Sequence, residues 1–368
     1  MELPYEEELG VPYLGRIFDK TSECYKFFWF QAILTKLEEG KSVFTFEELV
    51  DEMIAAAWYM VSEYHLNLGP KDNLEKAVRH IHETTNIKPS EKKSEILRYL
   101  RDCRDKEVLT IKKTLIKNVP YRLQAPFMPE VSNKELDSRM EDRIRRINEQ
   151  KHLIYYFNRY NGLRTTIHIQ PEWQLYFRKN REIIKGWLQY HMITYLQKRN
   201  PSVPGIANKL SPPQTRDLEK VIKYWRLIME LRPVHEIFHH EMVTEKELSI
   251  DHFVPWSYVA HDEFWNLHPT TRSINSKKSN YLPDWESYFP LFGEQEYISY
   301  QMMWEYEAVH REFDKCAKEH LNNSDIRHRL YRQSLSETEF KGQLKDVIEP
   351  VYYAAKNSGF GNWVFTEN

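Results

Sequence analysis

Apolar residues in the first third of the chain recur with the spacing of helices. The run from Tyr25 to Leu34 is typical of a buried helix, and Thr45 to Glu48 is a capping-box signature that opens another. Two more helices are expected over residues 72–84 and 90–105. Residues 1–130 therefore predict a helical N-terminal domain, for which sensing, partner docking and substrate selection are all open roles.

The hydrophobic period changes between residues 150 and 180. Two strand-like runs, Leu153 to Phe157 and Thr165 to Ile169, flank Asn161-Gly162, which is a strong hairpin signal. A small sheet is expected there. Helical spacing resumes over 174–198 and 217–231. A proline cluster lies between these two helices and is a candidate hinge or linker: Pro201, Pro204, Pro212 and Pro213.

Composition excludes several classes of protein. At 368 residues with 41% hydrophobic residues, the chain can bury two or three domain cores. No stretch of about 18 apolar residues occurs, and the first residues lack a leader pattern, so we expect neither secretion nor a membrane partner. The cysteines are odd in number and widely spaced, which supports neither a disulfide framework nor a cysteine zinc site. A cytoplasmic location is expected.

The charge is unevenly distributed. The whole chain carries a formal charge of −2, whereas residues 139–232 hold 19 Lys and Arg against eight Asp and Glu, a local net of +11. Aromatic residues interleave with these cations: Tyr155, Tyr156, Tyr160, Trp173, Tyr176, Trp187, Tyr190 and Trp225. Such a composition fits phosphate binding and base stacking, but equally fits solvated helix faces over an aromatic core. Both interpretations stay open.

The candidate chemistry lies between residues 248 and 283. Asp251 and His252 are adjacent at the end of a short apolar run that predicts a strand. Neighbouring residues of a strand face opposite ways, so the two side chains can share one pocket only if the strand ends there. Pro255 supplies that ending.

Further polar residues complete a set suited to phosphodiester hydrolysis. Asn266 follows a turn-rich loop, and a helix-like run beginning near residue 273 carries Asn275, Lys277 and Lys278. Carboxylate and amide oxygens are ligands for Mg²⁺ or Mn²⁺, and an imidazole beside such an ion can take a proton from water. The two lysines, if they stand at a helix start, can meet phosphate by charge and backbone N–H groups together.

This segment resembles the HNH endonuclease family, in particular the metal finger of RNA-guided CRISPR nucleases and of bacterial HNH proteins. The matching residues are Ile250 to Ser257, Asn266, and Thr271 to Ser279. The resemblance covers roughly residues 234–283, including an expected hairpin over 237–242.

The resemblance implies roles for four residues. Asp251 and Asn275 would be the metal ligands, His252 the general base, and Asn266 a structural residue that braces the active-site loop. Many members have His at the last position, where this chain has Asn. Many members also bind a structural zinc through two CxxC pairs, which this chain lacks. We therefore expect no structural zinc, and a finger held by packing of Phe253, Trp256, Tyr258, Phe264, Trp265 and Leu267.

Other residues near the motif have two interpretations each. Arg272 could contact substrate or form an ion pair with Asp262 or Glu263. His240 is a candidate auxiliary phosphate contact. A zinc cluster is less favoured than surface or packing positions for the group formed by His239, His240, His261 and His268, because their spacing is irregular.

Together these patterns predict an α+β fold, mostly helical, with a compact ββα-metal finger and a small sheet near residues 150–180. Four parts are expected: the helical domain over 1–130, a basic mixed segment over 131–232 that contacts nucleic acid, the finger over 233–295, and a helical region over 296–368.

The predicted function is Mg²⁺-dependent or Mn²⁺-dependent hydrolysis of DNA, for which the resemblance implies 5′-phosphate and 3′-hydroxyl products. A homodimer or a regulatory partner protein would be compatible with it. One alternative is a regulated effector nuclease of a bacterial anti-phage defence system. Another is a DNA-binding protein with a non-catalytic finger, against which the intact set of Asp251, His252 and Asn275 argues.

Overall fold

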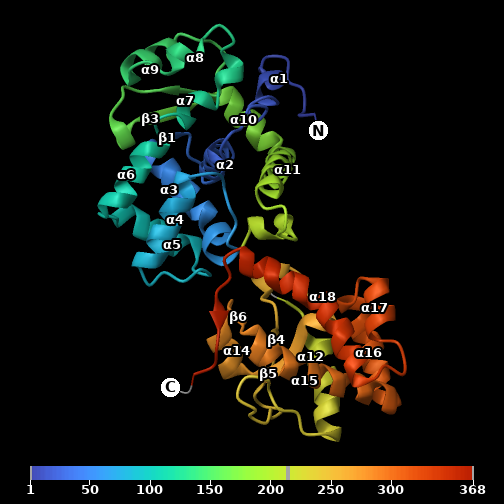
Figure 1. Ribbon diagram of the computed structural model, residues 1–368. Coiled ribbons are helices and arrows are strands. Elements are labelled where there is room, and N and C mark those ends of the chain that lie inside the picture. Colours follow the sequence, from blue (N-terminus) through green and yellow to red (C-terminus); the bar gives the residue numbers. More distant parts are fainter. Residues whose placement is uncertain (1, 213–215, 367–368) are drawn as a thin grey trace. The chain divides into compact units, whose positions relative to one another are not determined.

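The computed structural model describes residues 2–212 and 216–366, and the chain divides into two compact units (Figure 1). Unit 1 comprises residues 1–201 and 210–212, and unit 2 comprises 202–209 and 213–368. The division falls within the predicted proline cluster, of which Pro213 lies outside the described residues. The finer division at residues 130, 232 and 295 stays a prediction about folding units.

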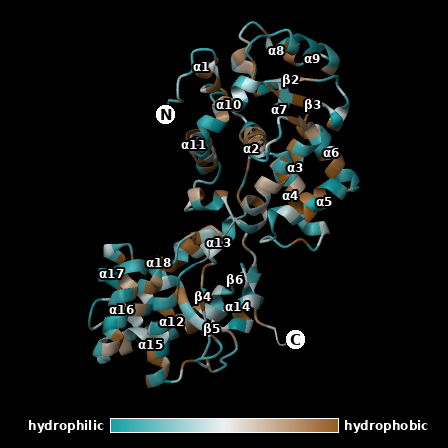
Figure 2. Cartoon of the chain, turned by 180° about the vertical axis from the view of Figure 1, so that it is seen from behind, coloured by the Kyte–Doolittle hydropathy of each residue, from teal (hydrophilic) through white to brown (hydrophobic). Residues whose placement is uncertain are grey.

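Unit 1 is built around helices α2 (Tyr25–Glu38) and α3 (Phe46–Trp58), which pack against each other. The Trp29 ring meets the Phe46 ring edge to face, with 5.6 Å between centroids. The capping box is confirmed, since Thr45 Oγ1 accepts from the N–H of Glu48 and the Glu48 carboxylate accepts from the N–H of Thr45. Figure 2 shows hydrophobic residues gathered along α2.

The remaining helices of unit 1 surround this pair, and the predicted helices over 72–84 and 90–105 are confirmed as α4 and α5. The helices are α1 (Val11–Leu14), α4 (Asn73–Thr84), α5 (Lys93–Asp102), α6 (Lys106–Leu115), α7 (Val119–Arg122), α8 (Asn133–Leu136), α9 (Met140–Asn148), α10 (Pro171–Lys179) and α11 (Arg181–Arg199). The helical spacing predicted over 174–198 is confirmed, and the structure divides it between α10 and α11 at Asn180 (φ −108°, ψ 23°).

A three-stranded antiparallel sheet completes unit 1. Strands β2 (Tyr155–Phe157) and β3 (Thr166–Ile169) form the predicted pair, and β1 (Val43–Thr45) joins the other side of β3 in the order β1-β3-β2. The sequence did not predict β1. Strand β1 has only three residues, the last of which is the N-cap of α3, so it shows no hydrophobic period of its own. It exists as a strand only through its pairing with β3.

Most of the aromatic residues in the basic segment belong to cores. Tyr155, Trp173, Tyr176, Trp187 and Trp225 are all buried. Of the eight aromatics proposed for base stacking, Tyr190 is the most exposed, with 55% of its surface accessible. The packing interpretation is therefore correct for these five aromatics, and the positive charge of the segment has to be judged without them.

Unit 2 holds the predicted ββα arrangement. Antiparallel strands β4 (Leu248–His252) and β5 (Leu267–Thr271) are followed directly by α14 (Arg272–Lys278). Around them lie α12 (Glu219–Leu231), α13 (Trp256–Val259), α15 (Trp285–Glu305), α16 (Glu307–His320), α17 (Ser324–Leu330) and α18 (Glu337–Asn357). Residues 321–323 separate α16 from α17. The mostly helical α+β class is thus confirmed.

Two further features tie unit 2 together. Strand β6 (Leu282–Pro283) pairs in parallel with β7 (Asn362–Trp363), which joins the end of the described chain to the segment after α14. Phe253 stacks on Phe292 of α15, with ring centroids 4.5 Å apart. The predicted packing of the finger is confirmed for Phe253, Tyr258, Phe264, Trp265 and Leu267, which are buried. Across the described residues, helices with the length and apolarity needed to span a bilayer are absent.

Glu296 in α15 is a buried carboxyl that makes the stability of unit 2 depend on pH. Burial raises the pKa of Glu296 well above its usual range. As pH rises from its ordinary pKa through the folded value, the unfolded chain loses this proton first, so stability falls. Glu296→Gln should remove this fall in stability at high pH and raise the free energy of unfolding at about pH 8 by on the order of 1 kcal/mol.

Thermal unfolding of the parent and the Gln variant at about pH 5 and about pH 8 measures this effect. The advantage of the variant should shrink at the lower pH. The exposed Glu294 of the same helix provides the matched control, and Glu294→Gln should change little at either pH. An advantage of Glu296→Gln that grows toward acid pH would contradict the assignment.

A candidate active site on the ββα finger

Strand β4 ends at His252, as Pro255 predicted, and its last two residues are both buried. In the antiparallel register Asp251 lies opposite His268, and His252 lies opposite Leu267. The hairpin expected over 237–242 is present as a short antiparallel bridge between His235 and Met242, and the N–H of Glu236 donates to the carbonyl of Glu241 at 2.9 Å. The two strands and α14 gather the predicted residues around one strand end.

The His252 ring is held at both nitrogens. Nε2 lies 2.8 Å from Asp262 Oδ1, and Nδ1 lies 3.1 Å from Nη1 of Arg216. A guanidinium only donates, so Nδ1 is the acceptor and the ring proton sits on Nε2, facing Asp262. Burial lowers the pKa of His252 and the Arg216 charge lowers it further, while Asp262 acts in the opposite direction. The ring is thus a neutral base with its lone pair on Nδ1.

Asp262 and Arg216 are site residues that sequence reasoning missed. Burial alone would raise the pKa of Asp262, but the hydrogen bond from His252 and the nearby Arg216 outweigh it, and the pKa is lowered. Arg216 is exposed and its guanidinium lies over the Trp256 ring, 5.6 Å from the centroid. Asp262 comes from the loop after α13 and Arg216 from before α12, so no local spacing could have paired either with His252.

Asp251 is a buried carboxylate in contact with two basic side chains. Oδ1 accepts from the backbone N–H of His252 at 2.7 Å. Oδ2 lies 3.0 Å from Lys278 Nζ, an ion-pair distance, although it lacks the alignment of a hydrogen bond to any described residue. Nε2 of His268 is 3.8 Å from the same oxygen. One oxygen of Asp251 is therefore left with unused capacity to accept.

The Asn275 side chain of α14 contacts strand β4 near the end at which Asp251 and His252 lie. Its Nδ2 donates to Ser249 Oγ at 2.9 Å and to the backbone carbonyl of Ile250 at 3.1 Å. Both amide hydrogens are used in this way, which leaves Oδ1 as an oxygen acceptor beside the Ile250–Asp251 peptide. A carboxylate oxygen and an amide oxygen are donors that a hard divalent cation accepts, so the residues present fit such an ion.

His268 is a further residue of the site that the sequence did not single out. It is fully buried between the rings of Phe238 and Phe292, and burial lowers its pKa to about 4. Neither ring nitrogen has a hydrogen-bond partner among the described residues. Its cross-strand place opposite Asp251 was the available signal, since antiparallel partners lie side by side.

Comparison with known proteins agrees with this geometry. Residues 235–284 match the family model described as HNH endonuclease. These residues are an HNH endonuclease domain. Such a domain implies nuclease activity on a nucleic acid, and the limits agree with the resemblance seen over 234–283. No curated protein and no solved structure matches the chain.

The two lysines of the HNH domain do not stand at a helix start, and that prediction is wrong. Helix α14 begins at Arg272 and ends at Lys278. At this end the carbonyls, not the N–H groups, are unpaired, so backbone donors cannot assist phosphate binding there. Lys278 is fully buried and donates to the carbonyl of His252 at 2.9 Å. Lys277 is exposed, with its ammonium 5.4 Å from the Phe365 ring centroid.

The other predicted residues lie at the edge of the domain. Arg272 is exposed at the first position of α14, and of its two interpretations the ion pair does not form among the described residues, since Asp262 contacts His252 and Glu263 accepts from Asn322. His240 adopts a left-handed turn conformation, with φ of 64°. It makes no hydrogen bond to Asp251 or His252 within the described part of the chain.

The group of four histidines does not form a centre in the structure. His239 lies 2.5 Å from Glu236, and His268 is packed between aromatic rings. Within residues 2–212 and 216–366, no three His, Cys, Asp or Glu side chains are placed to hold a metal together. The pair of Asp251 and Asn275 is one carboxylate and one amide, which suits an ion that keeps water and substrate as its other ligands.

Asn266 braces the loop after β4, and its loss should destabilise the HNH domain. The fully buried amide accepts from the N–H of Val254 at 2.8 Å and donates to the carbonyl of the same residue at 2.9 Å. Asn266→Ala leaves both backbone groups buried and unsatisfied, which should cost about 2 to 4 kcal/mol of stability.

Chemical denaturation of unit 2, followed by tryptophan fluorescence, measures that cost. The exposed Asn322 makes one side-chain hydrogen bond to Glu263, so Asn322→Ala is a matched control that should cost under about 0.5 kcal/mol. Equal stability of the Asn266 and Asn322 variants would show that the brace contributes nothing.

Proposed function

We propose that the protein is a metal-dependent endonuclease that hydrolyses phosphodiester bonds in DNA, with His252 as the general base and Asp251 and Asn275 as metal ligands. The observation that carries this proposal is the neutral His252 ring, whose Nδ1 is an acceptor and which directly follows Asp251 at the end of β4. A domain that only grips DNA needs no such base next to a ligand pair.

The tautomer of His252 is set by Asp262. Because Asp262 accepts from Nε2–H, the lone pair that can take a proton from water is on Nδ1. Arg216 donates to that lone pair at 3.1 Å, so it must turn away before a water can occupy the position. Its exposed cation is then free to meet the scissile phosphate, which makes Arg216 a substrate-binding residue in this proposal.

The ligand pair is positioned by its neighbours. Lys278 holds Asp251 through the ion pair at 3.0 Å, and Ser249 and Ile250 hold the Asn275 amide. When bound, a divalent ion such as Mg²⁺ or Mn²⁺ supplies stabilisation of the negative charge that develops on the phosphate and the leaving oxygen. In this proposal Lys278 is a positioning residue, whereas Lys277, Arg272 and His240 contact the phosphates outside the centre.

A part of the DNA affinity is assigned to the basic segment over residues 139–232. Arg178, Lys179 and Arg181 lie at the junction of α10 and α11 and are all exposed. Neutralising the three together should flatten the dependence of binding on salt, since each phosphate contact releases counterions. The slope of log affinity against log salt should fall by about 2 to 3 for a duplex probe.

Fluorescence anisotropy of a labelled duplex, repeated over a range of salt concentrations, gives that slope. A matched triple replacement of the exposed Arg145, Arg146 and Lys151 to Gln removes the same charge elsewhere in the segment. If both triple variants keep the parent slope and affinity, the positive charge belongs to solvated helix faces and the DNA assignment of the segment fails.

A time course on supercoiled plasmid, with a matched RNA substrate, tests the proposed reaction. One base and one metal pair process one phosphodiester at a time, so nicked circles should appear before linear DNA when the protein is monomeric. Binding without nicking at any Mg²⁺ or Mn²⁺ concentration would favour the non-catalytic alternative. Faster cutting of RNA would move the substrate class from DNA to RNA.

A further inference from the structure

Unit 1 contains a pocket that the nuclease reaction does not use. It lies between the end of α2, the following turn, the last part of α10 and the first two turns of α11, with a volume of about 330 Å³. This is near the lower end of the roughly 300–1,000 Å³ typical of small-molecule sites. Its lining joins residues far apart in the sequence, so the hollow is a product of the fold.

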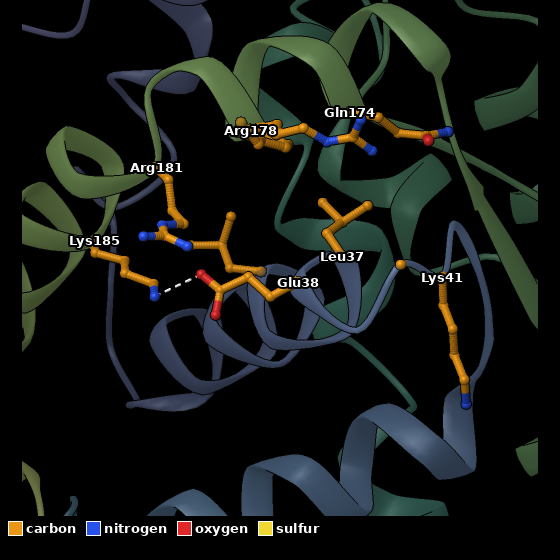
Figure 3. A pocket seen from close by; sticks show the side chains of 10 residues that line it. Leu37, Glu38, Lys41, Gln174, Arg178, Arg181 and Lys185 are labelled. Atoms are coloured by element: carbon orange, nitrogen blue, oxygen red, sulfur yellow. Dashed lines mark ion pairs between the residues drawn. The ribbon is translucent and has the colours of Figure 1, made fainter.

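The rim of the pocket is strongly positive. Figure 3 shows Arg178 on one side, Arg181 and Lys185 on another, and Glu38 below. Glu38 is paired with Lys185 at 2.5 Å. Arg181 contacts Glu182 through Nε at 2.8 Å, which leaves its two terminal nitrogens for other partners. Among the described residues, Arg178 has no carboxylate within ion-pair distance.

Lys41 adds to the charge only from the edge. Its side chain leads away from the other cations in Figure 3 and pairs with Glu48 of α3 at 3.2 Å. The groups that face the hollow are therefore two arginines and one already neutralised lysine. Each of these two guanidinium groups, carried by neighbouring helices, can bind a phosphate through two parallel hydrogen bonds.

The floor of the pocket is apolar. Leu34 and Phe177 are buried there and Leu37 is half-buried. Gln174 uses its Nε2 to donate to the carbonyl of Ile169 at 2.8 Å, so its Oε1 remains an acceptor. An inorganic phosphate would leave this floor uncovered. A ligand with a phosphate, an apolar planar part and amino groups would use all of the lining.

From this combination we propose that the pocket binds a nucleoside phosphate, with the phosphate on Arg178 and Arg181 and the base over Leu34 and Leu37. Two sources share this chemistry, a free nucleotide and the 5′-phosphorylated end of a nucleic acid strand. The site lies in unit 1, and its ligand binding is separate from the proposed cleavage by the HNH domain.

Isothermal titration calorimetry on the full chain tests the site without any cleavage. The probes are the four 5′-nucleoside monophosphates, inorganic phosphate, and one short single strand with either a 5′-phosphate or a 5′-hydroxyl. We expect a nucleotide or the 5′-phosphorylated strand to bind at least about tenfold tighter than inorganic phosphate. Arg178→Gln should weaken this binding by about tenfold or more, as expected for loss of a charge-assisted pair.

Arg104→Gln is the matched control, because Arg104 is also an exposed arginine of unit 1 but lies outside the lining and outside the basic segment assigned to DNA. Arg181→Gln should weaken binding independently, by removing the other guanidinium. Binding of the free nucleotide alone, or of the phosphorylated strand alone, decides the source. Equal affinity for nucleotide and inorganic phosphate, no binding of any probe, or equal effects of Arg178→Gln and Arg104→Gln would each overturn the proposal.

Discussion

His252→Ala is expected to lower the rate of DNA cleavage by about 10² to 10⁴, the usual contribution of a positioned acid–base group. The reason is specific to this ring. Its Nε2 proton is committed to Asp262 at 2.8 Å, so Nδ1 is the only nitrogen able to accept a proton from water. DNA binding and metal binding should persist, because neither depends on that lone pair.

A folding check and one further variant separate chemistry from folding. His252 is buried, so the Ala variant must first show a parental circular dichroism spectrum and thermal midpoint. Asp262→Asn keeps the ring but removes the carboxylate acceptor that sets its tautomer, and should cost about tenfold or more while the metal concentration at half-maximal rate stays the same. A folded His252→Ala protein that cleaves as fast as the parent at saturating metal would falsify the assignment of the base.

Asp251→Asn is expected to produce the second large effect, on metal dependence. The substitution removes the only carboxylate of the ligand pair and should raise the Mg²⁺ concentration at half-maximal rate by about tenfold or more, with part of the rate restored at high metal. Asn is preferable to Ala here. Lys278 is fully buried against Asp251, and deleting its partner outright would cost about 3 to 5 kcal/mol of stability.

The matched control is Glu247→Gln, which removes an exposed carboxylate just before the same strand. That variant should keep the parental metal dependence. Mg²⁺ titrations of the cleavage rate give the metal concentration at half-maximal rate. Electron paramagnetic resonance measures the binding of Mn²⁺ directly. Identical metal affinity in the Asp251 and Glu247 variants would remove Asp251 from the ligand set.

The sequence was informative where local geometry alone decides the structure. The ending of β4 near Pro255 and the hydrophobic alternation of β2 and β3 are encoded within a few residues. The HNH domain was predictable from its resemblance to a known family, because the residues that carry the resemblance lie close together in the sequence, between Ile250 and Ser279. Residues 235–284 duly match the family model.

What the sequence could not provide depends on chain segments that meet only in the fold. Arg216 and Asp262 reach His252 from two separate loops, and Arg178 and Glu38 line one pocket from two different helices. Helix limits were also uncertain to a few residues, which reversed the argument for Lys277 and Lys278. Both lysines were expected at the start of the helix, whereas they lie in its last turn.

We propose that the HNH domain is an active, metal-dependent nuclease centred on Asp251 and His252. The most direct measurement of this activity is incubation of the purified full chain with supercoiled plasmid, in Mg²⁺, in Mn²⁺ and in EDTA, with His252→Ala in parallel. Nicked plasmid is expected with either metal and none in EDTA, and the cleavage rate of the variant should be lower by about 10² or more. Nicking that proceeds equally in EDTA, or equally in the folded His252→Ala protein, would contradict the proposed activity.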